Sequence, residues 1–184
     1  MARTSMANLI AELRAMTDAG TADYTAGTVT YWSDDHLQTA LDRRRVDLKF
    51  VELNYAQGYS AGSAVYTDYV IPYRFIERDV EVLDSGGNAY GTALYTVDYD
   101  TGRVVFASST GGAAVYVNAQ VYDLYRTSAD IWRQKAAHLA RRYDVKTDNQ
   151  GLTRSQLMKQ ALEMAQLYDG MAGPQTVQVY RGDE

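Results

Sequence analysis

The sequence predicts an α+β protein in which a small bundle of about four helices carries a tyrosine-rich antiparallel β insertion between its second and third helices. Two observations lead to this prediction. Apolar residues recur three and four apart near both ends of the chain, whereas between Val46 and about Gln120 they alternate with polar residues. Because helical segments lie on both sides of the β region, we expect those segments to pack together into one bundle.

The chain of 184 residues divides into four regions by these patterns. Helices of the bundle are expected in residues 1–45, the β insertion in 46–120, further helices of the bundle in 121–172 and an extended docking tail in 173–184. The hydrophobic content of 46% is enough for a buried core.

The first helix is expected from Ser5 to Met16. Ser5 is a plausible N-cap, because its hydroxyl can accept a hydrogen bond from a backbone N–H of the first turn, and Gly20 is a plausible stop. The apolar face consists of residues at helical spacing: Met6, Leu9, Ile10, Leu13 and Met16.

The second helix is expected in the run "DDHLQTALDRRR", which follows Ser33 as a plausible N-cap. Two aspartates lie at the positive end of the helix dipole, and three arginines lie at its negative end: Arg43, Arg44 and Arg45. The residues expected to face inward are Leu37, Ala40 and Leu41.

The β insertion is marked by alternation, by turn residues and by tyrosine, of which the chain has 16. The run "ALYTVDYDTGRVVFAS" predicts a hairpin, because two alternating segments flank an Asp-Thr-Gly turn. Nine of the tyrosines fall in this region: Tyr55, Tyr59, Tyr66, Tyr69, Tyr73, Tyr90, Tyr95, Tyr99 and Tyr116. They are suited to cross-strand packing, to stacking on sugars or to contact with neighbouring subunits.

The third helix is expected from Val121 to about Val145, with an inward face at helical spacing: Ala129, Trp132, Ala136, Leu139 and Tyr143. Thr153 and Gln156 form a capping box that begins the fourth helix. The apolar stripe of that helix is expected to be Leu157, Ala161, Leu162, Ala165 and Tyr168, and Gly173 and Pro174 are expected to end it. The alternating residues that follow predict an extended segment.

Composition excludes several classes of protein. Without cysteine the chain has no disulfide framework and no cysteine-type zinc site. Charged residues interrupt the N-terminal apolar run, and no apolar run has the length of a membrane span, so we expect a soluble intracellular product. The net charge of −5 argues against a protein that grips nucleic acid.

The search for catalytic or metal-binding residues yields little. His36 and His138 have no second ligand at metal-binding spacing, and both are interpreted as solvated histidines on helix faces. Glu77, Asp79 and Glu81 are two apart, which predicts one solvated strand face. Together with nearby Asp84, paired acids of this kind leave a glycoside hydrolase open as a third hypothesis. We expect no enzyme, no cofactor and no metal.

Three segments carry a resemblance in their order and character: "YWSDDHLQTALDRR", then "YTVDYDTGRVVFA", then "AQVYDLYRTSADIWRQKAAHLARRYDVKTDNQGLTRSQLMKQALEMAQ". From about Tyr31 to Tyr168 the chain resembles the head–tail connector (adaptor) proteins of tailed bacteriophages and prophages. The resemblance implies a structural virion protein of the neck, assembled in the host cytoplasm as a dodecameric ring beneath the portal. Such a ring extends the DNA channel and binds the next neck or tail-completion protein.

This resemblance also suggests docking residues. In the family the C-terminal segment reaches into the portal protein, which assigns portal docking to Thr176, Val177, Val179 and Tyr180. Opposite charges are expected to meet between subunits of the ring. The candidates for that contact are Arg43, Arg44, Arg45, Glu77, Asp79 and Glu81.

DNA is expected to pass through the channel without specific binding, and no membrane partner is expected. The arginines equally suit a simple role at the end of the helix dipole. A carbohydrate-binding β module that uses the tyrosines as a platform is the alternative function.

Overall fold

The computed structural model describes residues 2–60, 63–140, 145–147, 150–152 and 154–173. These residues form two compact units. Unit 1 comprises residues 2–44 and 123–173, and unit 2 comprises residues 45–122. The α+β prediction is confirmed: four α-helices are described, and antiparallel sheets lie between the second and the third of them in the chain.

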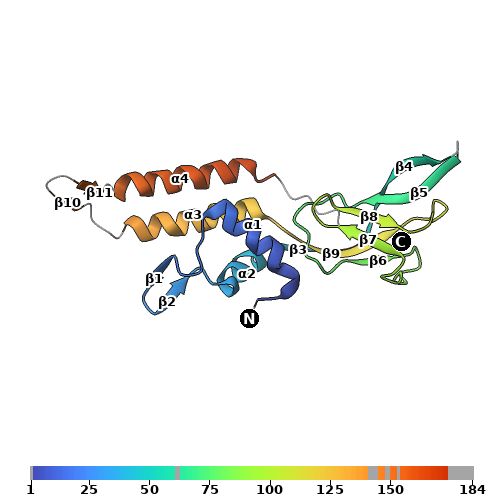
Figure 1. The fold of residues 1–184 in the computed structure, drawn as a ribbon, viewed down its shortest axis with the longest axis horizontal. Helices are drawn as coiled ribbons and strands as arrows, with labels where there is room; N and C mark the ends of the chain where they lie inside the picture. The colour runs from blue at the N-terminus through green and yellow to red at the C-terminus, as the bar shows by residue number, and fades with distance from the viewer. Residues whose placement is uncertain (1, 61–62, 141–144, 148–149, 153, 174–184) are drawn as a thin grey trace, which may run out of the picture. The chain divides into compact units, whose positions relative to one another are not determined.

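Unit 1 contains the helices and two short hairpins (Figure 1). Its N-terminal elements are η1 (Thr4–Met6), α1 (Ala7–Thr17), β1 (Tyr24–Ala26), β2 (Val29–Tyr31) and α2 (Asp34–Asp42). Its C-terminal elements are α3 (Leu124–Ala140), β10 (Val145–Thr147), β11 (Gln150–Leu152) and α4 (Arg154–Met171). Helix α3 lies beside α4 along its length and also contacts α1 and α2.

The first helix differs from its prediction at both ends. Ser5 lies inside the 3₁₀ turn η1, so the residue before α1 is Met6. At the other end the left-handed residue Asp18 (φ 49°) terminates α1, two residues before the expected Gly20. The carbonyl of Met16 there accepts the indole N–H of Trp132 (3.2 Å) and the hydroxyl of Tyr168 (2.9 Å). Side chains of α3 and α4 therefore donate hydrogen bonds to a backbone carbonyl at the C-terminal end of α1, where carbonyls lack partners within the helix.

The second helix is confirmed, including its cap. The hydroxyl of Ser33 accepts a hydrogen bond from the backbone N–H of His36 (3.3 Å), and Leu37 and Leu41 are fully buried. The prediction that three arginines end this helix is wrong for Arg45. The chain turns after Asp42 through the hydrogen bond from Arg44 N–H to the Leu41 carbonyl (2.8 Å), and Arg45 is the first residue of the next strand.

The third helix begins later than expected, because Val121 pairs with Val46 in a sheet. Helix α3 begins at Leu124, where the Asp123 carboxylate accepts the N–H of Arg126 (2.9 Å). The expectation that it continues to Val145 is also wrong, since Val145 lies in β10. Its inward face includes residues that the prediction missed: Thr127, Ser128 and Ile131. Tyr143 lies outside the described residues.

The fourth helix is confirmed as an element, but its apolar stripe is only partly inward. Ala161 and Ala165 are buried against the bundle, whereas Leu157 and Leu162 are 44% and 41% exposed. Helix α3 covers a narrower strip of α4 than the apolar pattern predicts. Thr153 of the expected capping box, Pro174 and the expected tail lie outside the described residues.

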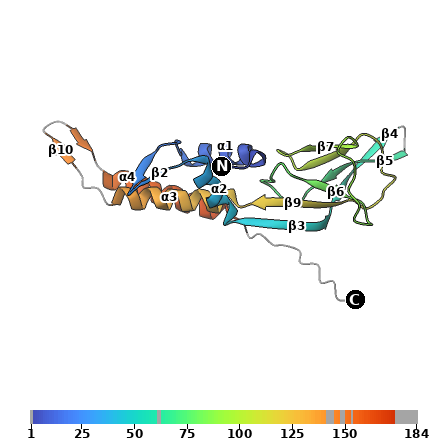
Figure 2. The ribbon, with the colours of Figure 1, turned by 90° about the horizontal axis from the view of Figure 1, so that it is seen from below.

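Unit 2 contains two antiparallel sheets, which Figure 2 shows with β3 beside β9. Its strands are β3 (Arg45–Glu52), β4 (Asn54–Ser60), β5 (Ser63–Val70), β6 (Glu81–Leu83), β7 (Tyr95–Asp98), β8 (Arg103–Phe106) and β9 (Tyr116–Tyr122). The three-stranded sheet has the order β3-β9-β6, and the four-stranded sheet has the order β4-β5-β8-β7. Apolar side chains from both sheets, such as Val117 and Val104, form one core cluster.

The predicted hairpin is β7–β8, with Asp98 opposite Arg103. The carboxylate of Asp98 accepts the backbone N–H of Asp100 (3.0 Å) and the hydroxyl of Thr101 (2.6 Å). Gly102 supplies the positive φ of 68° that the turn requires. The turn residues of the sequence therefore have the roles expected of them.

Candidate functional site

One face of the three-stranded sheet is polar and open. Along β9, Val117, Ala119 and Val121 are buried, so the alternate residues point to the opposite side. Asp47 on β3 pairs in register with Gln120 on that side. We call this surface the outer sheet face, and its residues are Arg45, Asp47, Lys49, Phe50, Asp79, Glu81, Tyr116, Asn118 and Gln120.

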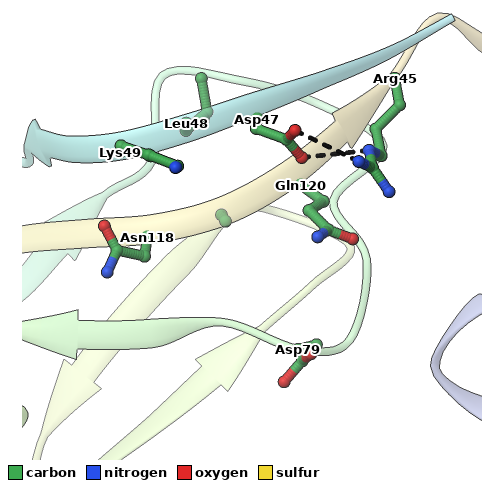
Figure 3. A pocket seen from close by; sticks show the side chains of 8 residues that line it. Arg45, Asp47, Leu48, Lys49, Asp79, Asn118 and Gln120 are labelled. Atoms are coloured by element: carbon green, nitrogen blue, oxygen red, sulfur yellow. Dashed lines mark hydrogen bonds and ion pairs between the residues drawn. The ribbon is translucent and has the colours of Figure 1, made fainter.

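An open cavity of about 320 Å³ lies on the outer sheet face (Figure 3). An ion pair between Arg45 Nε and Asp47 Oδ1 (3.1 Å) forms part of its wall. Lys49 and Asp79 also line it, and neither side chain has a hydrogen bond or ion pair within the part of the chain that the structure describes. Among the described residues, Lys49 and Asp79 thus line the cavity without a salt-bridge partner, which suits a polar partner surface of mixed charge.

Phe50 gives this face an aromatic anchor. A bulge in β3 between Leu48 and Val51 places Phe50 at φ +51°, in the left-handed region that costs an L-residue about 1–2 kcal/mol. Its N–H donates to Asn118 Oδ1 (2.9 Å), and its ring stacks on Tyr116 with centroids 4.1 Å apart. Because Phe50 as a residue remains 44% exposed, the fold holds an aromatic residue at the surface in a strained backbone conformation.

Three of the six predicted interface residues lie on the outer sheet face: Arg45, Asp79 and Glu81. Glu81 accepts a hydrogen bond from Asn118 Nδ2 (2.8 Å) across the sheet. The expectation that Glu77, Asp79 and Glu81 form one solvated strand face is wrong for Glu77, whereas Asp79 and Glu81 are exposed. Only Glu81 lies in a named strand, and Glu77 is 1% exposed.

Glu77 is buried beside β9, to which its backbone is hydrogen-bonded. Its N–H donates to the carbonyl of Gln120 (2.9 Å), and its carboxylate accepts the hydroxyl of buried Tyr122. A buried carboxylate requires such a partner, and the interaction ties the β6 side of the sheet to the end of β9. The Glu77 carboxylate is therefore buried and hydrogen-bonded, and it is not a solvated acid.

The other predicted docking residues belong to unit 1 or lie outside the described residues. Arg44 forms an ion pair with Asp130 of α3 (3.0 Å). Arg43 is exposed at the C-cap of α2, and its side chain makes no hydrogen bond or ion pair with any described residue. The residues assigned to portal docking, Thr176, Val177, Val179 and Tyr180, lie in the part of the chain that is not described.

The tyrosines of unit 2 mostly serve packing. The rings of Tyr69, Tyr90 and Tyr95 surround Phe106 with centroids 5.6, 5.1 and 5.8 Å away. Among the described tyrosine side chains of this unit, Tyr55 is the one classed as exposed, at 53%. A continuous tyrosine platform for sugars is thus not present on the described surface of the sheets.

The interpretation of both histidines as solvated is wrong. His36 stacks on Tyr31 and His138 stacks on Tyr24, with centroids 5.2 and 4.0 Å apart, and the two tyrosines stack on each other. This four-ring stack joins α2 to α3 through the β1–β2 hairpin. Burial raises the pKa of Tyr24 to about 12, so its hydroxyl keeps its proton at neutral pH.

The described residues contain no group of three or more histidine, cysteine or acidic side chains that could hold a metal ion. Within the same residues, no helix is long and apolar enough to cross a bilayer. Comparison with protein-family models, curated proteins and solved structures finds no match to this chain.

Sequence analysis missed several residues of the outer sheet face. The alternation in "YVNAQVY" was a usable signal for Tyr116, Asn118 and Gln120, because residues two apart on a strand share a face. Phe50 had no such signal. Its position depends on a bulge, and the alternation of a regular strand does not predict where an extra residue is inserted.

Proposed function

We propose that this chain is a structural adaptor of a tailed bacteriophage or prophage that joins the capsid to the tail or neck and has no catalytic role. The observation that carries the proposal is the order of segments. A capped helix, a tyrosine-rich antiparallel β region and a long helical pair follow one another here as in the head–tail connector proteins that the sequence resembles.

In this proposal the protein forms a homo-oligomeric ring, a dodecamer in the family, beneath the portal protein in the virion neck. The ring also contacts the next neck or tail-completion protein, and DNA passes through it without specific binding. The net charge of −5 supports passage without adhesion, because like charges do not hold the phosphate backbone.

The outer sheet face supports the docking part of the proposal. Protein interfaces are enriched in aromatic anchors surrounded by a polar rim, and Phe50 among the polar residues around Asn118 has this composition. The proposal assigns the face to contact with the portal protein, in addition to the C-terminal docking residues.

A genetic experiment tests the proposal. Removing the coding sequence from the phage that carries it should yield filled capsids and free tails that do not join, visible by electron microscopy. Supplying the wild-type chain should restore joined particles. Joined, infectious particles without the chain would contradict the proposal, as would specific binding of glycans by the purified monomer.

A matched pair of variants tests the outer sheet face. Phe50→Asn removes the ring while retaining a residue that tolerates the left-handed backbone, so the fold should persist. We expect retention on portal-bearing capsids to fall at least tenfold, by co-sedimentation. Leu94→Asn, which changes another exposed apolar residue of unit 2, is the control and should bind normally. If both variants were retained equally, the outer sheet face would not be part of the interface.

A further inference from the structure

Helix α4 has more apolar surface than its own unit covers. Among the described residues, four of the eight exposed large apolar side chains lie on this one helix: Leu157, Leu162, Leu167 and Met171. Ala161 and Ala165 form the strip that is buried, and the polar side of the helix carries the pair Lys159–Glu163 (3.9 Å). A helix that is apolar over such a wide arc is expected to be covered on more than one side.

The exposed residues, together with the partly buried Met158 and Met164, form two flanks on opposite sides of the buried alanine strip. At 3.6 residues per turn, Leu157, Met164, Leu167 and Met171 fall on one side, with the i, i+7, i+10 and i+14 spacing of a heptad seam. We call this the heptad flank. Met158 and Leu162 fall on the other side, which we call the second flank. Helix α4 lies beside α3 (Figure 1), and the buried alanine strip lies between the two flanks.

We infer that α4 is the lateral contact of the ring, in which the heptad flank of one copy packs against the second flank of the α4 helix of the next copy. The inference rests on the proposed function, since it names the surface through which that ring closes. The heptad spacing indicates that the segment packed against the heptad flank is a helix, because side chains at these positions fit between those of a facing helix.

The occupant is a second copy of this chain because α4 supplies both halves of the contact. Two different flanks on opposite sides of the same helix allow each copy to bind one neighbour on each side, and such a head-to-tail contact closes into a ring. A two-fold contact would use the heptad flank twice and leave Leu162 exposed. The heptad flank contains no charged residue, which disfavours nucleic acid or a charged ligand as its occupant. Asp169 falls on the second flank, where it pairs with Arg133 of α3.

The size of the contact predicts weak association in solution. An 18-residue helix is about 27 Å long, so one helix-to-helix contact buries less than the roughly 800 Å² per partner of a standard interface. Copies should therefore remain largely separate when dilute and associate when they are gathered at high local concentration, as on a portal ring.

Cysteine cross-linking tests the geometry, because this chain contains no cysteine of its own. Leu162→Cys protein mixed with Leu167→Cys protein should form dimers with a short bis-maleimide, and neither variant should do so alone. Lys159→Cys mixed with Glu163→Cys, on the polar side, is the control and should not cross-link. Circular dichroism checks that each variant is folded.

The outcomes separate this inference from the proposed function. The reaction is run on the concentrated free protein and on protein bound to portal-bearing capsids. The inference is supported if cross-links form in the mixture of Leu162→Cys and Leu167→Cys proteins and in neither variant by itself. Dimers of Leu167→Cys by itself would indicate a two-fold contact and overturn it.

Binding to capsids without cross-links in the mixture would overturn the inference while the proposed function stands. Failure of the wild-type chain to bind capsids would count against the proposed function, and the cross-linking of the free protein would still decide the inference.

A second measurement does not depend on cross-linker geometry. Leu157→Gln combined with Leu167→Gln should weaken self-association at least tenfold in sedimentation velocity, whereas Lys159→Gln on the polar side should leave it unchanged. Glutamine is a good helix former, so α4 should persist in each variant. Equal association of both variants would overturn the inference.

Discussion

Different kinds of interaction stand out inside each of the two units of this protein. Unit 2 has a continuous cluster of buried apolar side chains contributed by both of its sheets, all between Leu48 and Val121. In unit 1, polar side chains connect segments that are far apart in the chain. Arg3 pairs with Asp42 (2.7 Å), and Lys135 of α3 pairs with Asp23 (2.7 Å).

The end of α1 shows the difference most clearly. Trp132 and Tyr168 both donate to the carbonyl of Met16, and Lys135 Nζ donates to the carbonyl of Asp18 (2.8 Å). These bonds join the first helix to helices more than a hundred residues later. Unit 1 also buries apolar side chains such as Leu13 and Ile131. Burial is non-directional, whereas a hydrogen bond needs defined geometry, so these bonds add a directional constraint on where the helices of unit 1 lie.

Removal of unit 2 tests whether unit 1 folds without it and should have the largest effect. The N–H of Asp123 lies 3.4 Å from the carbonyl of Arg44, so a short Gly/Ser linker can replace residues 46–121. We expect the remaining chain to keep its α-helical far-UV circular dichroism and to lose assembly on capsids. Loss of the helical signal would show that unit 1 depends on unit 2.

Phe106→Ala should destabilise unit 2 selectively. The ring is buried among three tyrosines, and its truncation leaves a cavity, so we expect a loss of about 3–5 kcal/mol in the free energy of unfolding. Urea unfolding followed by near-UV circular dichroism measures it. Leu94→Ala, at an exposed site, is the control and should change stability by less than about 0.5 kcal/mol.

Trp132→Ala should destabilise unit 1 by about 3 kcal/mol, because it removes a half-buried ring and one donor to Met16. Tyr168→Phe removes only the other donor to the same carbonyl and should cost about 1 kcal/mol. Far-UV circular dichroism during urea unfolding measures both. An unchanged midpoint for Trp132→Ala would show that this side-chain cap contributes nothing to stability.

Acid titration of the β7–β8 turn should show the smallest effect. The hydroxyl of Thr101 and the N–H of Asp100 hold the pKa of Asp98 below its ordinary value. A lowered folded-state pKa stabilises the fold above the unfolded value of about 3.9, and this contribution disappears as the pH falls through the folded-state pKa. Asp98→Ala should therefore be less stable than wild type at neutral pH and equally stable in strong acid.

Urea unfolding at a series of pH values measures this difference, with Asp100→Ala as the control. Asp100 lies in the same turn, and its carboxylate makes no hydrogen bond or ion pair with the described residues. A difference between Asp98→Ala and wild type that does not change with pH would contradict the assigned role of the carboxylate.

The fold class followed from local patterns in the sequence. Helical spacing predicted α1 and α2, Ser33 predicted the cap of α2, and the Asp-Thr-Gly turn predicted the hairpin β7–β8. These features depend on residues within a few positions of one another. Hydrophobic spacing and turn chemistry act over that range, so the sequence alone was sufficient for them.

What the tertiary structure decided is which surfaces are covered. Glu77 is inward because β9 supplies Tyr122, Leu162 is exposed because α3 covers only part of α4, and Phe50 is at the surface because of a bulge in β3. In each case the local sequence around the side chain is compatible with either a buried or an exposed position. The packing of segments distant in sequence selects between them, because burial and hydrogen bonding depend on the partner that the fold brings near.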